Sequence, residues 1–150
     1  MSGAESDIVQ VLQTAVTPVV LISGVGLLLL TMTNRFGRLT DRTRQLAGLV
    51  KNSEGEERES MKAQLRILSQ RGRLLRRSIA EAGFCVLSAS LLIITLFITT
   101  LANTTLEWLD STFFILSLVF LILSLVDFIR DVHRALEAMA LEVGEDWNKK

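Results

Sequence analysis

Apolar residues of this chain gather in three runs of about twenty residues, and polar stretches separate these runs. The runs cover residues 8–31, 82–101 and 106–126. An α-helix needs about 20 apolar residues to cross a hydrocarbon core of roughly 30 Å. We therefore predict three transmembrane helices, with a short connection at residues 102–105 between the second and the third.

Between the first two runs, at residues 32–80, apolar positions recur at the alternating steps of four and three that are typical of coiled coils. One series is Met32, Phe36, Leu39, Thr43, Leu46 and Val50, and the other is Met61, Leu65, Leu68, Gly72, Leu75 and Ile79. Two helices with such stripes can pair as an antiparallel hairpin, which would place Gly72 opposite Leu39. Ser53 and Glu56 have the spacing of a capping box, which would begin the second helix of the pair.

The third run continues past the membrane as a helix over residues 127–143. Its apolar stripe is Leu125, Ile129, Val132, Leu136, Met139 and Val143. Gly144 is placed to end this helix, which leaves a tail at residues 144–150. The predicted fold is an all-α membrane protein of one domain, in which three transmembrane helices carry a helical hairpin and a C-terminal helical extension.

Basic residues are unevenly distributed, although the formal net charge is zero. Twelve of the sixteen Lys and Arg residues lie between Arg35 and Arg77, and the other four follow the third run. Segments rich in Lys and Arg stay in the cytoplasm. We therefore predict a cytoplasmic hairpin, a cytoplasmic C-terminus and an outer N-terminus. Residues 1–7 include no Lys or Arg, so we expect the first run to be a retained span and not a cleaved signal.

The residues that usually carry catalysis or bind metals are scarce in this chain. A single cysteine, Cys85, excludes a disulfide within the chain and a zinc site built on several thiolates. The single histidine, His133, stands beside Arg134 on a charged helix, which favours a solvated surface position. No phosphate-binding loop or complete dinucleotide fingerprint is present. We expect a protein that is not an enzyme and that has no catalytic residues, metal or cofactor.

The stretch that leaves the first span, LLLLTMTNRFGRLTDRTRQL, resembles the signature of the bacterial membrane family of domain of unknown function 2721. That pattern is an apolar span followed by T-N-R-F/Y-x-R and then D-R-x-R. The matching residues are Thr33, Asn34, Arg35, Phe36, Arg38, Asp41, Arg42 and Arg44. The resemblance implies a multi-pass protein of the bacterial inner (plasma) membrane. It implies no particular activity, so the function has to be argued from the residues.

One line along the first helix is polar outside, apolar in the middle and basic inside. It comprises Asp7, Gln10, Thr14, Thr17, Leu21, Gly24, Leu28, Thr31, Arg35, Arg38 and Arg42. Around the axis of an oligomer this line would form a pore, with Asp7 at the outer mouth and a constriction at Leu21 and Leu28. In the alternative interpretation the small residues mark helix packing, and the arginines contact anionic lipid headgroups.

A second set of charged residues is expected at the inner end of the spans. It comprises Arg35, Arg38, Arg76, Arg77, Glu81, Asp127 and Arg130. Ionisable groups at this depth are candidates for function. We interpret the set as an ion-pair lock between helices, with Asp127 as its central acid.

Two classes of function therefore stay open. One is an oligomeric ion channel lined by the first helix, and the other is a membrane scaffold that binds anionic lipid or a cytoplasmic partner. The expected partners are the bilayer, anionic headgroups and further copies of the chain, four or more, together with ions if the channel hypothesis holds. Nucleic acid is not expected, because Phe36 is the only aromatic residue among the arginines of the first basic stretch.

Overall fold

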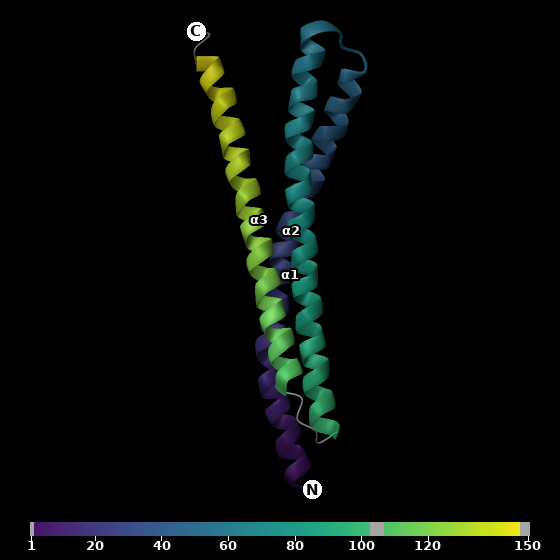
Figure 1. The fold of residues 1–150 in the computed structure, drawn as a ribbon, viewed down its shortest axis with the longest axis vertical. Helices are drawn as coiled ribbons and strands as arrows, with labels where there is room; N and C mark the ends of the chain where they lie inside the picture. The colour runs from purple at the N-terminus through teal and green to yellow at the C-terminus, as the bar shows by residue number, and fades with distance from the viewer. Residues whose placement is uncertain (1, 103–106, 148–150) are drawn as a thin grey trace. The chain divides into compact units, whose positions relative to one another are not determined.

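Three long α-helices make up the computed structural model of this chain, which describes residues 2–102 and 107–147 (Figure 1). The helices are α1 at Ser2–Val50, α2 at Gly55–Ala102 and α3 at Glu107–Trp147. All three are long and apolar enough to cross a membrane. This confirms the predicted all-helical class with three membrane-span-like helices. In each helix the apolar run and the charged residues that adjoin it belong to one unbroken α-helix.

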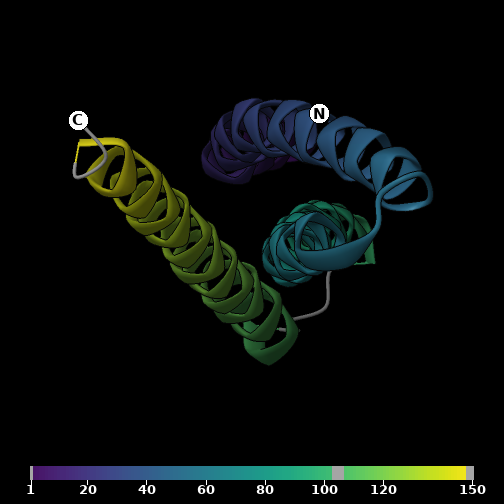
Figure 2. The ribbon, with the colours of Figure 1, turned by 90° about the horizontal axis from the view of Figure 1, so that it is seen from above.

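The short connection between α1 and α2 differs in detail from the prediction (Figure 2). The backbone N–H of Asn52 donates to the carbonyl of Leu49 at 3.0 Å, and the hydroxyl of Ser53 donates to the same carbonyl at 3.0 Å. Ser53 therefore closes the end of α1, whereas the predicted capping box would have placed it at the start of α2. Gly55, with φ +67°, begins α2 in a backbone conformation that favours glycine.

The C-terminal end of α3 also differs from the prediction. The helix passes through Gly144 and continues to Trp147, so the glycine does not end it. A glycine inside a helix costs only about 1 kcal/mol relative to alanine, and the neighbouring helical residues can offset this cost. The predicted connection at residues 102–105 and the start of the third span at Leu106 lie largely outside the described residues.

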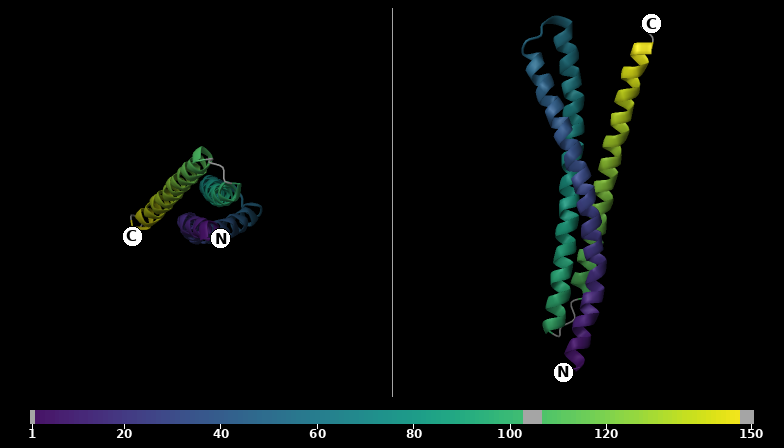
Figure 3. Two further views of the ribbon diagram at one scale, coloured as in Figure 1. Left: turned by 90° about the horizontal axis from the view of Figure 1, so that it is seen from below. Right: turned by 180° about the vertical axis from the view of Figure 1, so that it is seen from behind.

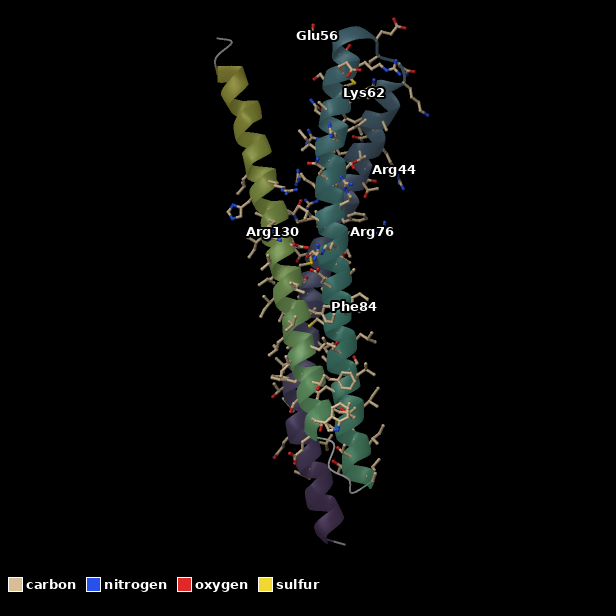
Figure 4. All side chains as sticks on the ribbon, in the orientation of Figure 1. Arg44, Glu56, Lys62, Arg76, Phe84 and Arg130 are labelled. Carbon is tan, nitrogen blue, oxygen red and sulfur yellow. The ribbon has the colours of Figure 1, made fainter. Side chains whose placement is uncertain are left out.

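The chain divides into two compact units, which we describe separately. The first unit comprises residues 1–30 and 80–123. Its core is a cluster of Val25, Ala82 and Cys85, against which Leu21, Leu29, Val86, Phe120 and Leu121 pack. Phe84 and Phe120 stack with ring centroids 5.4 Å apart, and Figure 4 labels Phe84 on α2. Small side chains at the centre of the cluster let the helix backbones approach closely.

The second unit comprises residues 31–79 and 124–150. Within it, the parts of α1 and α2 on either side of their connection lie side by side (Figure 3), and Oγ of Ser78 lies 3.4 Å from the sulfur of Met32. A Cβ atom on Gly72 would lie 3.5 Å from Leu39, so the contact expected between these two positions is present. Met32 and Leu75 are almost fully buried, as expected of residues on the coiled-coil stripes.

The buried face of α3 is polar. Among the described side chains of α3, the buried ones are Ser117, Ser124, Asp127 and Asp131. Its exposed large side chains include Ile115, Ile122, Leu125, Ile129 and Leu136. The predicted stripe on α3 is therefore largely exposed where its side chains are described. Such an arrangement suits a membrane, because lipid solvates apolar side chains and polar groups need partners inside the protein.

Candidate functional site

Two buried aspartates on α3 form the centre of the candidate site. Asp127 is 4% exposed and Asp131 is fully buried. They stand four residues apart, so they lie on the same face of the helix. A carboxylate that is removed from water requires positive partners and hydrogen-bond donors, and both aspartates have them within the second unit.

Asp131 connects all three helices of the second unit. The Nε–H of Arg71 on α2 donates to Oδ1 of Asp131 at 3.3 Å. Nη2 of Arg35 on α1 lies 3.9 Å from Oδ2 of the same carboxylate. The guanidinium of Arg35 also lies over the ring of Phe128, 5.3 Å from its centroid, at a distance typical of a cation–π contact. One carboxylate thus holds α1 and α2 against α3.

Asp127 forms a second ion-pair cluster, one turn earlier on α3. Nε of Arg77 lies 3.1 Å from its Oδ2, and Nη1 of Arg130 donates to its Oδ1 at 3.1 Å. The side chains of these arginines are 67% and 64% exposed, whereas that of Asp127 is only 5% exposed. Each arginine therefore reaches from a buried acid to the surface of the unit.

A pair of serines brings α2 and α3 together just before the aspartates. The hydroxyl of Ser78 donates to the carbonyl of Ser124 at 2.7 Å, and the hydroxyl of Ser124 donates to the carbonyl of Ser78 at 2.8 Å. Met32 of α1 contacts the same point, with its sulfur 3.4 Å from Oγ of Ser78. Reciprocal bonds of this kind require two small side chains, so the two helices approach closely at this point.

The predicted charge cluster is assembled only in part. Asp127 is paired with Arg77 of α2, as expected for a lock between helices, and with Arg130 of its own helix, but Arg35 binds Asp131 instead. Arg38 and Arg76 are exposed and form no ion pair among the described residues. The seventh member of the predicted cluster, Glu81, is buried and belongs to the first unit.

Asp131 and Arg71 were missed by sequence reasoning, although α3 carries a usable signal. Asp131 follows Ser124 by seven residues and Asp127 by four, which places all three on one helical face. The predictions followed the apolar stripe of α3. In a spanning helix the polar stripe is the better guide to the face that other helices cover.

The line proposed to form a pore is divided between exposed and covered positions. Thr17, Gly24, Thr31, Arg38 and Arg42 are exposed, whereas Leu21, Leu28 and Arg35 are half-buried. Leu21 packs against the core cluster of the first unit, and Arg35 is held by Asp131. The side chains of Asp7, Gln10 and Thr14 lie outside the described residues. Part of the line is therefore already occupied by contacts within the chain.

Basic and acidic side chains are segregated in the second unit. Residues 31–50, 66–79 and 124–136 contain eleven arginines and three aspartates, and two of these aspartates are the buried Asp127 and Asp131. We call the exposed basic set the arginine collar: Arg38, Arg42, Arg44, Arg66, Arg73, Arg76, Arg77, Arg130 and Arg134. Figure 4 labels three of its members, Arg44, Arg76 and Arg130. The surface of this part of the second unit is strongly positive, although the formal net charge of the whole chain is zero.

The two buried aspartates and the arginine collar were compared, as part of the whole chain, with known proteins. No curated protein and no solved structure matches the chain. A scan against protein families matches residues 15–141, which are most of the chain, including the two aspartates and the whole collar. The chain belongs to the family described as Protein of unknown function (DUF2721).

Proposed function

We propose that this chain is a non-enzymatic scaffold of the bacterial inner membrane whose arginine collar binds anionic lipid headgroups. In this proposal the N-terminus lies outside the cell, the paired ends of α1 and α2 form a cytoplasmic hairpin, and the C-terminus is cytoplasmic. One observation carries the proposal: two of the three aspartates of this region are buried, whereas nine of its eleven arginines are exposed. A surface of this composition attracts a negatively charged layer.

The position of the collar along the chain supports lipid as the counter-charge. Arg76 and Arg77 precede the apolar part of α2 by only a few residues, and Arg38 follows the apolar part of α1 at a similar distance. A basic residue near an anionic membrane surface contributes about 1 kcal/mol to binding. Several such residues together would retain a shell of anionic lipid, and long arginine side chains can reach the headgroups from either side of that level.

We expect the collar to select anionic lipid when the protein is extracted from a mixed bilayer. The protein would be incorporated in nanodiscs of equal parts phosphatidylglycerol and phosphatidylcholine, and the lipids retained after extraction would be counted by native mass spectrometry. Retained lipid should be enriched in phosphatidylglycerol several-fold. The triple variant Arg38→Gln/Arg42→Gln/Arg76→Gln should lose most of this enrichment, because three exposed charges are removed without touching the buried aspartates.

A matched control for the triple variant removes charge elsewhere. Lys51→Gln/Arg58→Gln/Lys62→Gln lies near the connection between α1 and α2, far along the chain from the apolar runs. It should retain the enrichment of wild type. Equal retention of the two lipids by the wild-type protein would refute the proposal, and so would equal losses in the two triple variants.

An oligomeric ion channel lined by α1 is the second candidate. Thr17, Gly24 and Thr31 favour it, because they are exposed polar or small positions on a spanning helix. A Cβ atom placed on Gly24 would have no packing contact within 4 Å among the described residues, apart from its own stretch of helix. Further copies of the chain, or water in a pore, could cover them. The candidate needs four or more copies around an axis, which the native mass of the protein in lipid nanodiscs decides. Leu21 would also have to leave the core cluster to reach a pore.

A further inference from the structure

A depression in the arginine collar, between α2 and α3 of the second unit, has the size to hold a single ligand. It has a volume of about 440 Å³ and is lined by Gln70, Arg73, Leu74 and Arg77 of α2 and by Arg134 of α3. The four residues of α2 are spaced 3, 1 and 3 positions apart, so they share one face of the helix. All five residues belong to the second unit.

The charge around this depression is unbalanced. Three of its five described lining residues are arginines, and none of these five residues carries a carboxylate. The nearby buried acids on α3 are already engaged, because Asp131 binds Arg35 and Arg71 and Asp127 binds Arg77 and Arg130. Arg73 and Arg134 join no ion pair in the part of the chain that the structure describes. Guanidinium groups that surround one space repel one another, and an anion placed between them relieves that repulsion.

We propose that this depression is a binding site for one phosphate group. A guanidinium presents donors in a planar fork that matches two phosphate oxygens, so arginines are well suited to a tetrahedral oxyanion. Arg73 and Arg134 would hold the phosphate from two helices, and the amide of Gln70 would add a neutral donor. Arg77, whose Nε lies 3.1 Å from Asp127, would be fixed at the rim.

The phosphate could belong to an anionic lipid or to a soluble phosphate ester. The predicted second span begins at Ala82. Arg77 lies five residues before it, which is about 7 Å of helix, and Arg73 lies about 6 Å further from the span. The headgroup layer is roughly 5–8 Å thick on each side of the hydrocarbon core. The site would therefore open at the edge of that layer, within reach of lipid and of solution. The inference rests on the proposed function, since it adds a single saturable site to the general selection of lipid by the collar.

The test compares two double variants in detergent at constant ionic strength. Arg73→Gln/Arg134→Gln removes two lining arginines, and Arg38→Gln/Arg66→Gln removes two collar arginines that do not line the depression. The probes are glycerol 3-phosphate and short-chain phosphatidylglycerol, with chloride and short-chain phosphatidylcholine as their respective controls. At 100 times the Kd, a single-site ligand should raise the melting temperature by about 5 °C or more.

We expect at least one phosphate probe to raise the melting temperature saturably in the wild type and in the Arg38→Gln/Arg66→Gln variant. The Arg73/Arg134 variant should bind that probe at least tenfold more weakly. A response to the lipid alone identifies a headgroup as the source, and a response to glycerol 3-phosphate identifies a soluble ester. No response to either probe, or equal affinity in the two double variants, would overturn the site.

The results separate this inference from the proposed function. If the collar enriches phosphatidylglycerol in nanodiscs while neither probe gives a saturable rise, the proposed function stands and the phosphate site fails. If glycerol 3-phosphate binds at the depression while the nanodisc lipids are retained equally, the site stands and the lipid scaffold fails.

Discussion

Replacing Asp131 by asparagine is expected to lower the stability of the detergent-solubilised protein by about 2 kcal/mol. The substitution keeps the size of the side chain but removes the charge that pairs with Arg35 and Arg71. Breaking a fully buried pair costs about 3–5 kcal/mol, and we expect less here because the two arginine side chains are 28% and 21% exposed. The melting temperature should fall by about 5 °C, which a thermal unfolding curve followed by circular dichroism measures.

Two further asparagine variants give this prediction its scale. Asp41 is exposed on α1, so Asp41→Asn should change stability by less than about 0.5 kcal/mol. Asp127→Asn should lower stability by an intermediate amount, because the arginines that pair with Asp127 are more exposed than those at Asp131. It should also loosen the contact between α2 and α3 on detergent extraction, because it weakens the pair with Arg77. If the Asp131→Asn and Asp41→Asn proteins have the same melting temperature, the carboxylate of Asp131 does not hold the three helices together.

Replacing Ser78 by leucine is expected to separate α2 from α3 in the second unit. Ser78 is fully buried, and its hydroxyl and carbonyl both bond to Ser124. A leucine would lose the hydroxyl bond and put three carbon atoms in place of one oxygen at a close helix contact, which together should cost about 3 kcal/mol. The melting temperature should fall by about 10 °C, and proteolysis of α3 in detergent should accelerate.

The size of the side chain can be separated from the loss of the hydrogen bond. Ser78→Ala removes the hydroxyl without adding bulk, so it should cost only about 1 kcal/mol. Ser23 is exposed and bonds only to its own helix at the carbonyl of Val19, so Ser23→Leu should be nearly neutral in detergent. A Ser78→Leu protein as stable as the Ser23→Leu protein would show that α2 and α3 are not closely packed at this point.

The sequence predicted the helices well because hydrophobic spacing is a local signal. Three apolar runs gave three long helices, and the contact of Gly72 with Leu39 was found from the coiled-coil pattern alone. The ends of elements were less certain, since capping depends on which hydroxyl reaches which carbonyl. Ser53 bonds back to Leu49, and α3 passes through Gly144. The spacing of these residues does not encode either outcome, so neither was predicted.

The candidate site was predicted only in part because it depends on which face of α3 is covered. The charge cluster included Asp127, Arg77 and Arg130 but omitted Asp131, whose partner Arg71 lies sixty residues earlier in the chain. No spacing rule connects residues so far apart. The segregation of charge was also invisible, since residues 31–50, 66–79 and 124–136 contain eleven arginines and three aspartates, but the sequence does not show that two of these aspartates are buried.

The central claim is that the members of the arginine collar nearest the apolar runs, Arg38, Arg76, Arg77 and Arg130, lie at the level of the lipid headgroups, and label depths along α1 measure this directly. Gly26, Gly37 and Gly48 are exposed, and a Cβ atom on each would meet nothing within 4 Å. They are spaced eleven residues apart, which is about 16 Å of helix and nearly a whole number of turns. Each would be replaced by cysteine in a Cys85→Ala background and spin-labelled in anionic vesicles.

Accessibility of the three labels to oxygen and to a water-soluble nickel chelate then gives their depth by electron paramagnetic resonance. The account predicts that the label at Gly26 lies among the acyl chains, the label at Gly37 at the headgroups and the label at Gly48 in water. Labels at Gly37 and Gly48 that are equally accessible to the chelate, or a label at Gly37 as deep as the label at Gly26, would contradict it.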